Sequence, residues 1–500
     1  MPRLPGENPG PYEIAPEGTI PVRIAGVGLL LATLALGIFG IGRSLWMDEA
    51  WVANSVLAPS LSGMFYYPDW LQTTPPLFLL LTRGVVLALG PSNVAFRLLP
   101  LAFALVGVAS MMAVARRLVS APFAVTACAF LAFNPTAIEY SRTCKQYSAE
   151  MAASAAIVLC TSIYLRNPLR HRFFWLLGAF VVVLPLAWST AFLLPGIALA
   201  VYAHSGIRRA GALVLIAGGV LAALYFAFIR QNLSPELRTF WIANAESRSP
   251  ALLAALALCL AAAVRLIWTR AWMQFVALLP CLLLAAANAL GLYPASPRTR
   301  LFALPCFLLV AALGAEDLSR WLTRGSRVPV FIGSLAWLVA AALASEAAWK
   351  QIGEHQNAPV EDFEGAVRYL RQHVASSDLL LVNASVIEGF KLYTAMDRWP
   401  DHHAIYADTG WPCCRREKAS TRGTSTERVV DEDLDRKIPA GFSGRVWLLY
   451  SARHTHWMWA GPDEGVLWRS HLTERGCPPG PYYRVLPNLA ISSMDCANAR

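Results

Sequence analysis

Charged side chains are scarce in this sequence. Only 15% of its 500 residues are Asp, Glu, Lys or Arg, whereas 56% are hydrophobic. In a typical soluble protein, about a quarter of the residues are charged. The apolar residues also gather into runs of membrane-spanning length, with polar breaks between them. The composition therefore excludes a soluble protein and predicts a polytopic α-helical membrane protein.

Acidic residues are scarcer than basic ones: 32 Asp and Glu stand against 42 Lys and Arg, for a net charge of +10. Such an excess could indicate nucleic-acid binding. The arginines, however, lie mainly at the ends of apolar runs, at Arg116-Arg117, Arg166, Arg170, Arg172, Arg208-Arg209, Arg265, Arg270, Arg320, Arg324 and Arg327. That position is typical of cytoplasmic loops in membrane proteins. We therefore expect the lipid bilayer as a partner and no nucleic acid.

A cleavable signal is also missing. The first apolar run, about 21–41, lacks the small-residue cleavage site that ends a secretory signal peptide. We therefore expect it to stay in the protein as a membrane anchor. Residues 1–20 before it are rich in Pro and Gly, and we expect them to form a disordered cytoplasmic N-terminus.

Placing every arginine cluster in the cytoplasm predicts about 11 transmembrane helices and a membrane catalytic domain over 21–345. The expected spans are about 21–41, 98–115, 121–138, 148–165, 173–188, 189–203, 210–229, 251–267, 272–292, 301–316 and 328–345. Arg172 and Arg208 both lie in basic flanks, so an even number of crossings separates them. Two short helices turning near Pro185 to Thr190 meet that condition.

Residues 75–90 are apolar but are not counted as a span. The run is only about sixteen residues long, and Arg83 in its middle would be costly in lipid. Counting it would also place Arg116-Arg117 outside the cell. We expect it to lie along the outer membrane surface, within a long first external loop over 42–97.

After Ser345 the sequence becomes polar, and parity places residues 346–500 outside the membrane as a soluble extracytoplasmic α/β domain. Residues 360–374 have the period of an amphipathic helix, with Phe363, Val367 and Leu370 on one face. Residues 378–382 and 445–450 are predicted strands. Residues 419–437 are charged and polar, and we expect a flexible loop there.

Cysteines divide between the two parts of the chain. Those in or beside apolar runs, including Cys128, Cys160, Cys259 and Cys306, are expected to be inert. Cys413, Cys414, Cys477 and Cys496 fall in the extracytoplasmic domain. An oxidising compartment allows disulfides among these four, but the sequence leaves their pairing open.

The segment Trp46-Met47-Asp48-Glu49-Ala50-Trp51 directly follows the first apolar run. Carboxylates near hydrocarbon lose hydration, so such groups usually mark a functional site. The alternative is an ordinary acidic loop beside an interfacial belt of aromatic residues.

Further polar residues from distant segments are predicted on the same external face. They are Asp69, Arg97, Tyr140, Arg142, Lys145, Tyr147, Glu150, Tyr293, Arg298 and Arg300. Carboxylates that take a proton and cations that hold an anion suit a transfer with a phosphate leaving group. Arginine and lysine also bind phospholipid head groups without any chemistry, and that alternative stays open.

Several short motifs together resemble a known family. They are Asp48-Glu49, Thr74-Pro75-Pro76-Leu77, Arg97-Leu98-Leu99-Pro100, Tyr140-Ser141-Arg142 with Tyr147-Ser148, and Arg300-Leu301-Phe302-Ala303-Leu304-Pro305. In this order they resemble the polyprenyl-phosphate-dependent glycosyltransferases of the C-type membrane fold. That group includes the family 39 protein mannosyltransferases and the lipid A aminoarabinose transferases. The resemblance covers roughly 21–345, and its order agrees with the topology drawn from the arginines.

The resemblance implies roles for the polar residues. Asp48 would act as general base on the acceptor, and Glu49 would assist it or bind a divalent cation such as Mg or Mn, which only some members need. The donor phosphate would be held by Arg142, Lys145, Arg300 and Arg97, and other substrate groups by Tyr140, Tyr147, Asp69 and Arg298.

Two positions depart from the family pattern. The aminoarabinose transferases carry an acidic-basic pair before their Pro-Pro, where this chain has Thr73-Thr74. That puts identity with their activity in doubt. Cys144-Lys145 replaces the more usual small residue and arginine, so Lys145 would be a substitute cation that cannot form a bidentate fork.

The expected function is transfer of a sugar from a polyprenyl-phosphate donor to an extracytoplasmic acceptor hydroxyl, with inversion, in the inner (plasma) membrane. The acceptor would be a glycan, a lipid or a protein.

The alternative from another class is a transporter or flippase of a lipid-linked sugar. Transporters carry ionisable groups within their spans or paired broken helices in two related halves. The spans here are almost free of charge and no internal repeat is visible. A catalytically inactive scaffold is a third reading, which an activity assay would test.

Overall fold

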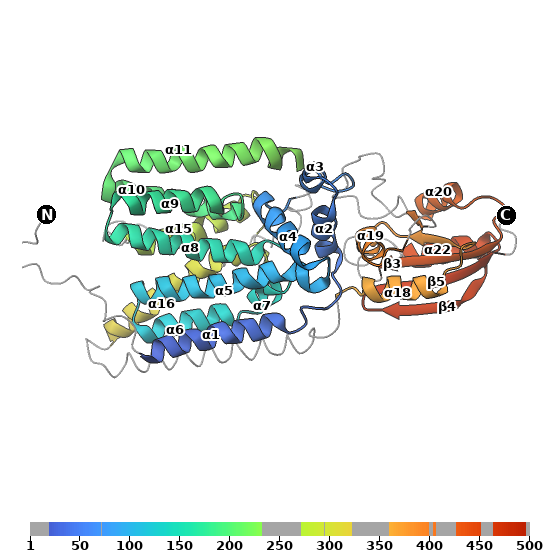
Figure 1. Cartoon of the computed structure of the whole chain (residues 1–500), viewed down its shortest axis with the longest axis horizontal. Coiled ribbons are helices and arrows are strands. Elements are labelled where there is room, and N and C mark those ends of the chain that lie inside the picture. The colour runs from blue at the N-terminus through green and yellow to red at the C-terminus, as the bar shows by residue number, and fades with distance from the viewer. Residues whose placement is uncertain are drawn as a thin grey trace, which may run out of the picture.

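The computed structural model describes residues 20–71, 73–232, 272–294, 296–322, 360–399, 404–406, 427–451 and 464–496. They form two parts, a helical bundle and a C-terminal sheet domain beyond one end of it (Figure 1). The bundle contains the helices α1 (Ile20–Ile38), α5 (Asn93–Leu118), α6 (Ala121–Ala132), α7 (Pro135–Ser141), α8 (Tyr147–Arg166), α9 (Arg170–Val183), α10 (Leu194–Ser205), α11 (Ile207–Leu224), α15 (Trp272–Ala289) and α16 (Leu304–Leu322).

The bundle holds together through apolar helix faces that pack closely, with α5 and α8 at its centre. Gly107 of α5 makes part of this approach possible, because a Cβ there would lie 3.4 Å from the Cα of Ala152 in α8. Small residues at helix contacts are typical of membrane bundles. Phe123, Phe180 and Phe302 are fully buried in the same apolar core.

Among the described residues, 4 helices are long and apolar enough to cross a membrane: α5, α8, α15 and α11 with its continuation to Asn232. A fifth is added if α6 and α7, which meet at 57°, count as one span. Asn134 begins α7 by accepting a hydrogen bond from the Ala137 N–H, which explains the break. The multi-pass membrane architecture is confirmed, whereas the figure of about 11 spans stays a prediction. The expected spans 251–267 and 328–345 lie outside the described residues.

The turn expected between Pro185 and Thr190 is confirmed. Helix α9 ends at Val183, and a 3-10 turn, η1 (Trp188–Leu193), leads into α10. A second such turn, η3 (Leu301–Ala303), precedes α16, and the π-turn η2 (Tyr225–Ile229) and α12 (Arg230–Asn232) extend α11.

The first loop folds into three helices at the end of the bundle that faces the C-terminal domain (Figure 1). They are α2 (Met47–Leu57), α3 (Leu61–Phe65) and α4 (Pro76–Leu89). The apolar run left out of the spans is α4, a helix of 14 residues. Arg83 in this helix donates to the Ala58 carbonyl oxygen at 2.8 Å, and the Leu77 N–H donates to Pro185 O at 3.0 Å. These bonds tie α4 to α2 and to the turn after α9.

The C-terminal domain is built on a five-stranded sheet of order β2-β1-β3-β5-β4. Its strands are β1 (Leu379–Val382), β2 (Ala404–Tyr406), β3 (Gly444–Ser451), β4 (Pro479–Leu486) and β5 (Leu489–Cys496). The first three pair in parallel, and β4 and β5 are antiparallel additions. The predicted strands at 378–382 and 445–450 are therefore confirmed, as is the α/β class.

Four helices accompany this sheet: α18 (Phe363–His373), α19 (Ile387–Met396), α20 (Glu427–Lys437) and α22 (Glu464–Glu474). The predicted amphipathic helix is α18, with Phe363, Val367 and Leu370 fully buried. An apolar cluster then continues from this domain into the first loop, where it includes Ala50 and Val56 of α2.

The expectation of a flexible loop over 419–437 is wrong for its second half, which forms α20. Charge pairs on the helix explain the difference: Asp433 lies 2.6 Å from Arg436 and 3.5 Å from Lys437. Leu434 is fully buried, and Asp435 lies 3.0 Å from the His471 ring of α22. Residues 419–426 lie outside the described residues.

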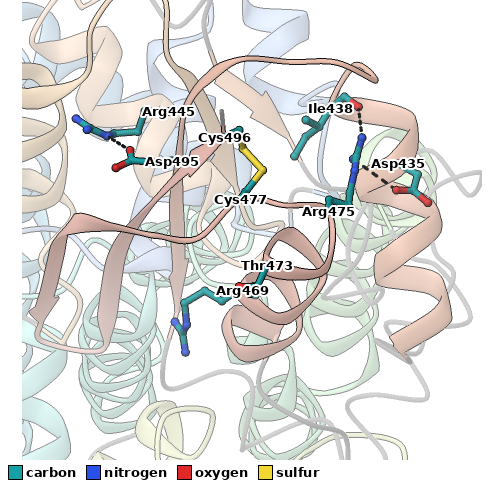
Figure 2. The surroundings of a disulfide bond; sticks show 9 residues. All are labelled: Asp435, Ile438, Arg445, Arg469, Thr473, Arg475, Cys477, Asp495 and Cys496. Carbon is teal, nitrogen blue, oxygen red and sulfur yellow. Dashed lines mark hydrogen bonds and ion pairs between the residues drawn. A yellow bond between two sulfur atoms is a disulfide. The ribbon is translucent and has the colours of Figure 1, made fainter. Parts of the chain in front are cut away.

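One disulfide is described, between Cys477 and Cys496. Figure 2 shows it joining Cys477, two residues before β4, to the end of β5, beside the Arg445–Asp495 ion pair at 2.7 Å. The bond therefore clamps the β4–β5 hairpin. Cys413 and Cys414 lie outside the described residues. Cys128, Cys160 and Cys306 in the bundle are free thiols.

Candidate active site

Helix α2 carries the two acidic residues of the first loop. Its buried face, which includes Ala50, Ala53 and Val56, packs on α4 and on α19. Asp48 and Glu49 lie in its first turn, where the positive end of the helix dipole stabilises carboxylates. The two adjacent side chains nevertheless enter different surroundings.

Glu49 forms a buried ion pair with Arg97 of α5, and both side chains are fully buried. Arg97 Nε donates to Glu49 Oε1 at 2.8 Å and Nη2 donates to Oε2 at 2.5 Å. The Cys144 N–H also donates to Oε1 at 2.6 Å. The remaining Arg97 donors reach the carbonyl oxygens of Ile41, at 2.9 Å, and of Arg43 and Ser44. This pair therefore joins α2, α5 and the turn before α8.

Arg142 lies in a second paired cluster. Its Nη2 and Nε donate to Glu139 Oε2 at 3.0 and 3.2 Å, and its Nη1 donates to the Phe39 carbonyl oxygen at 3.0 Å. Arg43 also pairs with Glu139. The predicted phosphate ligands Arg97 and Arg142 are thus both taken up by carboxylates and carbonyl groups.

Asp48 has a different partner. Arg298, from the loop before α16, donates from Nη1 to Asp48 Oδ2 at 3.0 Å. The two side chains are partly exposed, at 18% for Asp48 and 35% for Arg298. The structure therefore brings the predicted base together with a cation from a segment 250 residues away.

Lys145 lies beside this pair. Within the described residues its ammonium takes part in no ion pair, and its nearest aromatic partner is Trp51, with Nζ 5.9 Å from the ring centroid. Burial lowers the pKa of this ammonium, the nearby Asp48 carboxylate opposes that shift, and the Arg298 guanidinium adds to it. Two cations thus face one carboxylate, and a half-buried ammonium rests on an aromatic face.

Two tyrosines border the same place. The rings of Tyr140 and Tyr147 meet edge to face at 4.8 Å, and Asp48 and Arg298 act electrostatically on both hydroxyls. Asp69 lies elsewhere, 2.5 Å from the Lys391 ammonium of α19. Arg300 is exposed at the start of η3. The structure therefore gathers Asp48, Lys145, Arg298, Tyr140 and Tyr147, whereas Asp69 pairs with Lys391 and Arg300 is exposed.

A divalent cation does not fit at Glu49. Both of its oxygens already accept hydrogen bonds, and a metal ion there would face the Arg97 guanidinium. Among the described residues no group of three or more His, Cys, Asp or Glu is arranged for a metal ion. The chemistry of this site is therefore argued from its own side chains.

Several contacts that come from the C-terminal domain could not be predicted from the sequence. The Met47 N–H at the start of α2 donates to Glu361 Oε2 at 2.7 Å, and the Leu45 N–H donates to the Tyr393 hydroxyl at 2.7 Å. Glu361 lies 314 residues from Met47 along the chain. No local spacing could have indicated such a pair.

Solved structures with a similar fold place this arrangement among known proteins. ArnT from Cupriavidus metallidurans in the apo state matches with a TM-score of 0.53 at 12% identity, over 94% of this chain and 97% of that one. The same protein bound to undecaprenyl phosphate matches with a TM-score of 0.51 at 11% identity, over the same shares. An Archaeoglobus fulgidus oligosaccharyltransferase in complex with Zn and sulfate matches with a TM-score of 0.50 at 11% identity, over 95% of this chain and 73% of that one.

At these identities the similarity shows the fold alone. It confirms the predicted C-type membrane glycosyltransferase fold, which both neighbours share. No protein-family model and no curated protein matches the sequence.

Proposed function

We propose that this protein is a membrane glycosyltransferase that moves a sugar from a polyprenyl-phosphate donor to an acceptor hydroxyl. The fold supports a transferase that uses a lipid-phosphate carrier, because the similar structures are enzymes of that kind. The cluster of Asp48, Lys145 and Arg298 supplies the groups that such a transfer needs.

This proposal rests most on the position of the Lys145 ammonium, which is half-buried and forms no ion pair within the described residues. A charge held away from water is costly unless a counter-charge accompanies it. This ammonium lies near the Trp51 ring and in the field of Asp48, with smaller contributions from Cys144 and Glu49. A phosphate beside Lys145 and Arg298 would complete this site, because two anions, Asp48 and the phosphate, would then face the two cations.

The reaction we propose is a single displacement at the anomeric carbon of the donor sugar. The acceptor oxygen forms its bond to that carbon while the bond from carbon to the phosphate oxygen breaks. Asp48 takes the acceptor proton, and the bonding electron pair leaves with the polyprenyl phosphate. Lys145 and Arg298 hold the phosphate as its charge grows. Attack opposite the leaving group inverts the anomeric configuration.

Three predicted ligands receive different roles in this proposal. Arg97 and Arg142 have a structural role, because each already pairs with a carboxylate, which Arg142 shares with Arg43. Arg300, which is exposed, receives no role in this proposal. Glu49 is a structural anchor of α2 and neither a base nor a metal ligand. Tyr140 and Tyr147 stay as substrate contacts beside Asp48.

The proposed active face lies outside the cytoplasm, together with the C-terminal domain. The disulfide between Cys477 and Cys496 supports this side, because such bonds persist in oxidising compartments. The arginine clusters at the other ends of the spans support it as well. Reagents that label only from the cytoplasm should then leave an engineered cysteine at Ser92 unmodified.

The test of the function uses the purified full chain in lipid nanodiscs with a panel of polyprenyl-phosphate sugars and acceptor glycans, lipids and peptides. Release of polyprenyl phosphate with gain of sugar on an acceptor is the expected result. Asp48→Asn should lower kcat by about a thousandfold, within the range of a lost general base. Asp69→Asn serves as the matched control, because its partner is Lys391. Movement of intact donor across the bilayer without transfer would instead indicate a flippase.

A further inference from the structure

The residue that caps the N-terminus of α2 supplies no side-chain acceptor. The residue before the helix is Trp46, whose side chain makes no capping hydrogen bond. Helix N-termini prefer Ser, Thr, Asp or Asn at this position, because their oxygens accept the first free backbone N–H groups. Glu49, in the first turn, accepts the Trp46 N–H at 3.4 Å, as the second residue of a capping box does. The Met47 N–H is left to an acceptor from another part of the chain.

The C-terminal domain supplies the missing acceptor. Glu361 lies just before α18 and is fully buried, and its Oε2 accepts the Met47 N–H at 2.7 Å. A carboxylate at this point satisfies a backbone donor and also faces the positive end of the helix dipole. Met47 directly precedes Asp48, so the bond fixes the backbone next to the proposed base.

Neighbouring contacts from the same domain hold the residues that lead into α2. Tyr393 of α19 accepts the Leu45 N–H at 2.7 Å and donates its own hydroxyl proton to Asn93 Oδ1 at 2.6 Å. The Glu364 N–H of α18 donates to Ser44 Oγ at 3.2 Å. These three bonds cross between the C-terminal domain and the first loop, at Ser44, Leu45 and Asn93.

On the other side of Asp48, the Glu49 carboxylate is held by Arg97 from the membrane bundle. Asp48 therefore lies between two fixed neighbours, one fastened to the C-terminal domain and the other to the bundle. Its side chain alone is left to meet Arg298 and the substrate. A shift of about 1 Å in such a group can lower a rate by about a hundredfold.

We infer that Glu361 is a positioning residue for the transfer, so the C-terminal domain is a working part of the active site. This inference rests on the proposed function for its kinetic consequence, and on the geometry alone for the cap. It assigns Glu361 no contact with the substrate. The domain would therefore be needed for turnover whatever acceptor it also contacts.

The test compares Glu361→Ala with Glu361→Gln and with Asp378→Ala in the full chain. Asp378 is the matched control, since it is a buried carboxylate of the same domain that accepts the Ala375 N–H and the Trp447 indole N–H. Glu361→Ala should lower kcat by about a hundredfold and leave the KM for the donor unchanged, because Lys145 and Arg298 stay in place. Glu361→Gln keeps an acceptor oxygen and should retain kcat within about fivefold.

Amide hydrogen exchange separates the cap from the catalytic proposal, because it needs no activity. Met47 to Ala50 should exchange at least about fivefold faster in Glu361→Ala, as expected for the loss of one capping bond, but not in Asp378→Ala. Unchanged exchange would overturn the cap. Faster exchange with a normal kcat would overturn the positioning role. A wild-type protein without transfer activity would overturn the proposed function. The cap would still be tested by the exchange measurement.

Discussion

Two clusters of charge at the same end of the bundle differ in how they are balanced. In the paired cluster, Arg97 meets Glu49, and Arg142 and Arg43 meet Glu139. In the open cluster, Lys145 and Arg298 share Asp48. Each cluster has one cation more than it has carboxylates, but every cation of the first pairs directly with a carboxylate, whereas Lys145 of the second forms no ion pair within the described residues. The difference predicts a structural role for the paired cluster and anion binding by the open cluster.

The two adjacent residues of α2 express this contrast most sharply. Glu49 is fully buried against Arg97, and removing one partner from such a pair leaves an uncompensated charge inside the protein. Asp48 and Arg298 are partly exposed, and ion pairs of that kind contribute about 0–1 kcal/mol. Substitution of Glu49 should therefore lower mainly the stability of the protein, whereas substitution of the adjacent Asp48 should lower mainly its activity.

The largest expected effect on stability is that of Glu49→Gln, which should lower the free energy of unfolding by about 3–5 kcal/mol. Asp48→Asn should lower it by less than about 1 kcal/mol. Reversible unfolding by SDS in mixed micelles measures both. Equal losses in the two variants would contradict the division between a structural and a catalytic carboxylate.

A loss of stability away from both clusters should leave the chemistry intact. Replacing Cys477 and Cys496 by serine opens a loop with a sequence separation of 19 residues and should cost the C-terminal domain about 3 kcal/mol. Hydrogen exchange in β4 and β5 should accelerate, while the kcat of the folded enzyme stays near the wild-type value. A proportional loss of kcat would show that the hairpin supports the site directly.

Within the open cluster, Arg298→Ala should raise the KM for the donor and lower kcat/KM by about tenfold to a hundredfold. That range is what a hydrogen bond to a charged group contributes. Arg300→Ala, two residues along the same loop, is the matched control, because its side chain is exposed. An effect of Arg300→Ala as large as that of Arg298→Ala would show that Arg300 also binds the phosphate.

The smallest expected effect is on the pH profile. Burial lowers the pKa of the Lys145 ammonium from its usual 10.5, so the charge that holds the phosphate is lost at a lower pH than in a free lysine. The kcat/KM of the free enzyme should therefore fall on the alkaline side. Lys145→Arg keeps its charge and should move this limb to higher pH. An unchanged limb would mean that another group titrates there.

Local patterns predicted those parts of the fold that local physics determines. The apolar face of α18 follows from the helical period of Phe363, Val367 and Leu370, and β1 follows from a short apolar run. Basic flanks predicted the turn after α9. The α20 helix was missed, because its support comes from Leu434 packing and from His471 on another helix.

The predicted site contained the correct segments but not their pairings. The sequence placed Glu49, Arg97, Arg142 and Lys145 on one face, yet it could not say which cations a carboxylate neutralises. That depends on how α2 approaches α5, which is set by packing between distant parts of the chain. Glu361 was missed for the same reason, since its partner Met47 lies 314 residues away.

The contrast between the clusters is tested most directly by the affinity for polyprenyl phosphate, measured in nanodiscs with wild type, Lys145→Ala and Arg142→Ala. Lys145→Ala is expected to weaken binding by about tenfold or more, because the phosphate loses its half-buried partner. Folded Arg142→Ala is expected to bind as the wild type does. Equal weakening in both variants, or an effect of Arg142→Ala alone, would contradict the contrast.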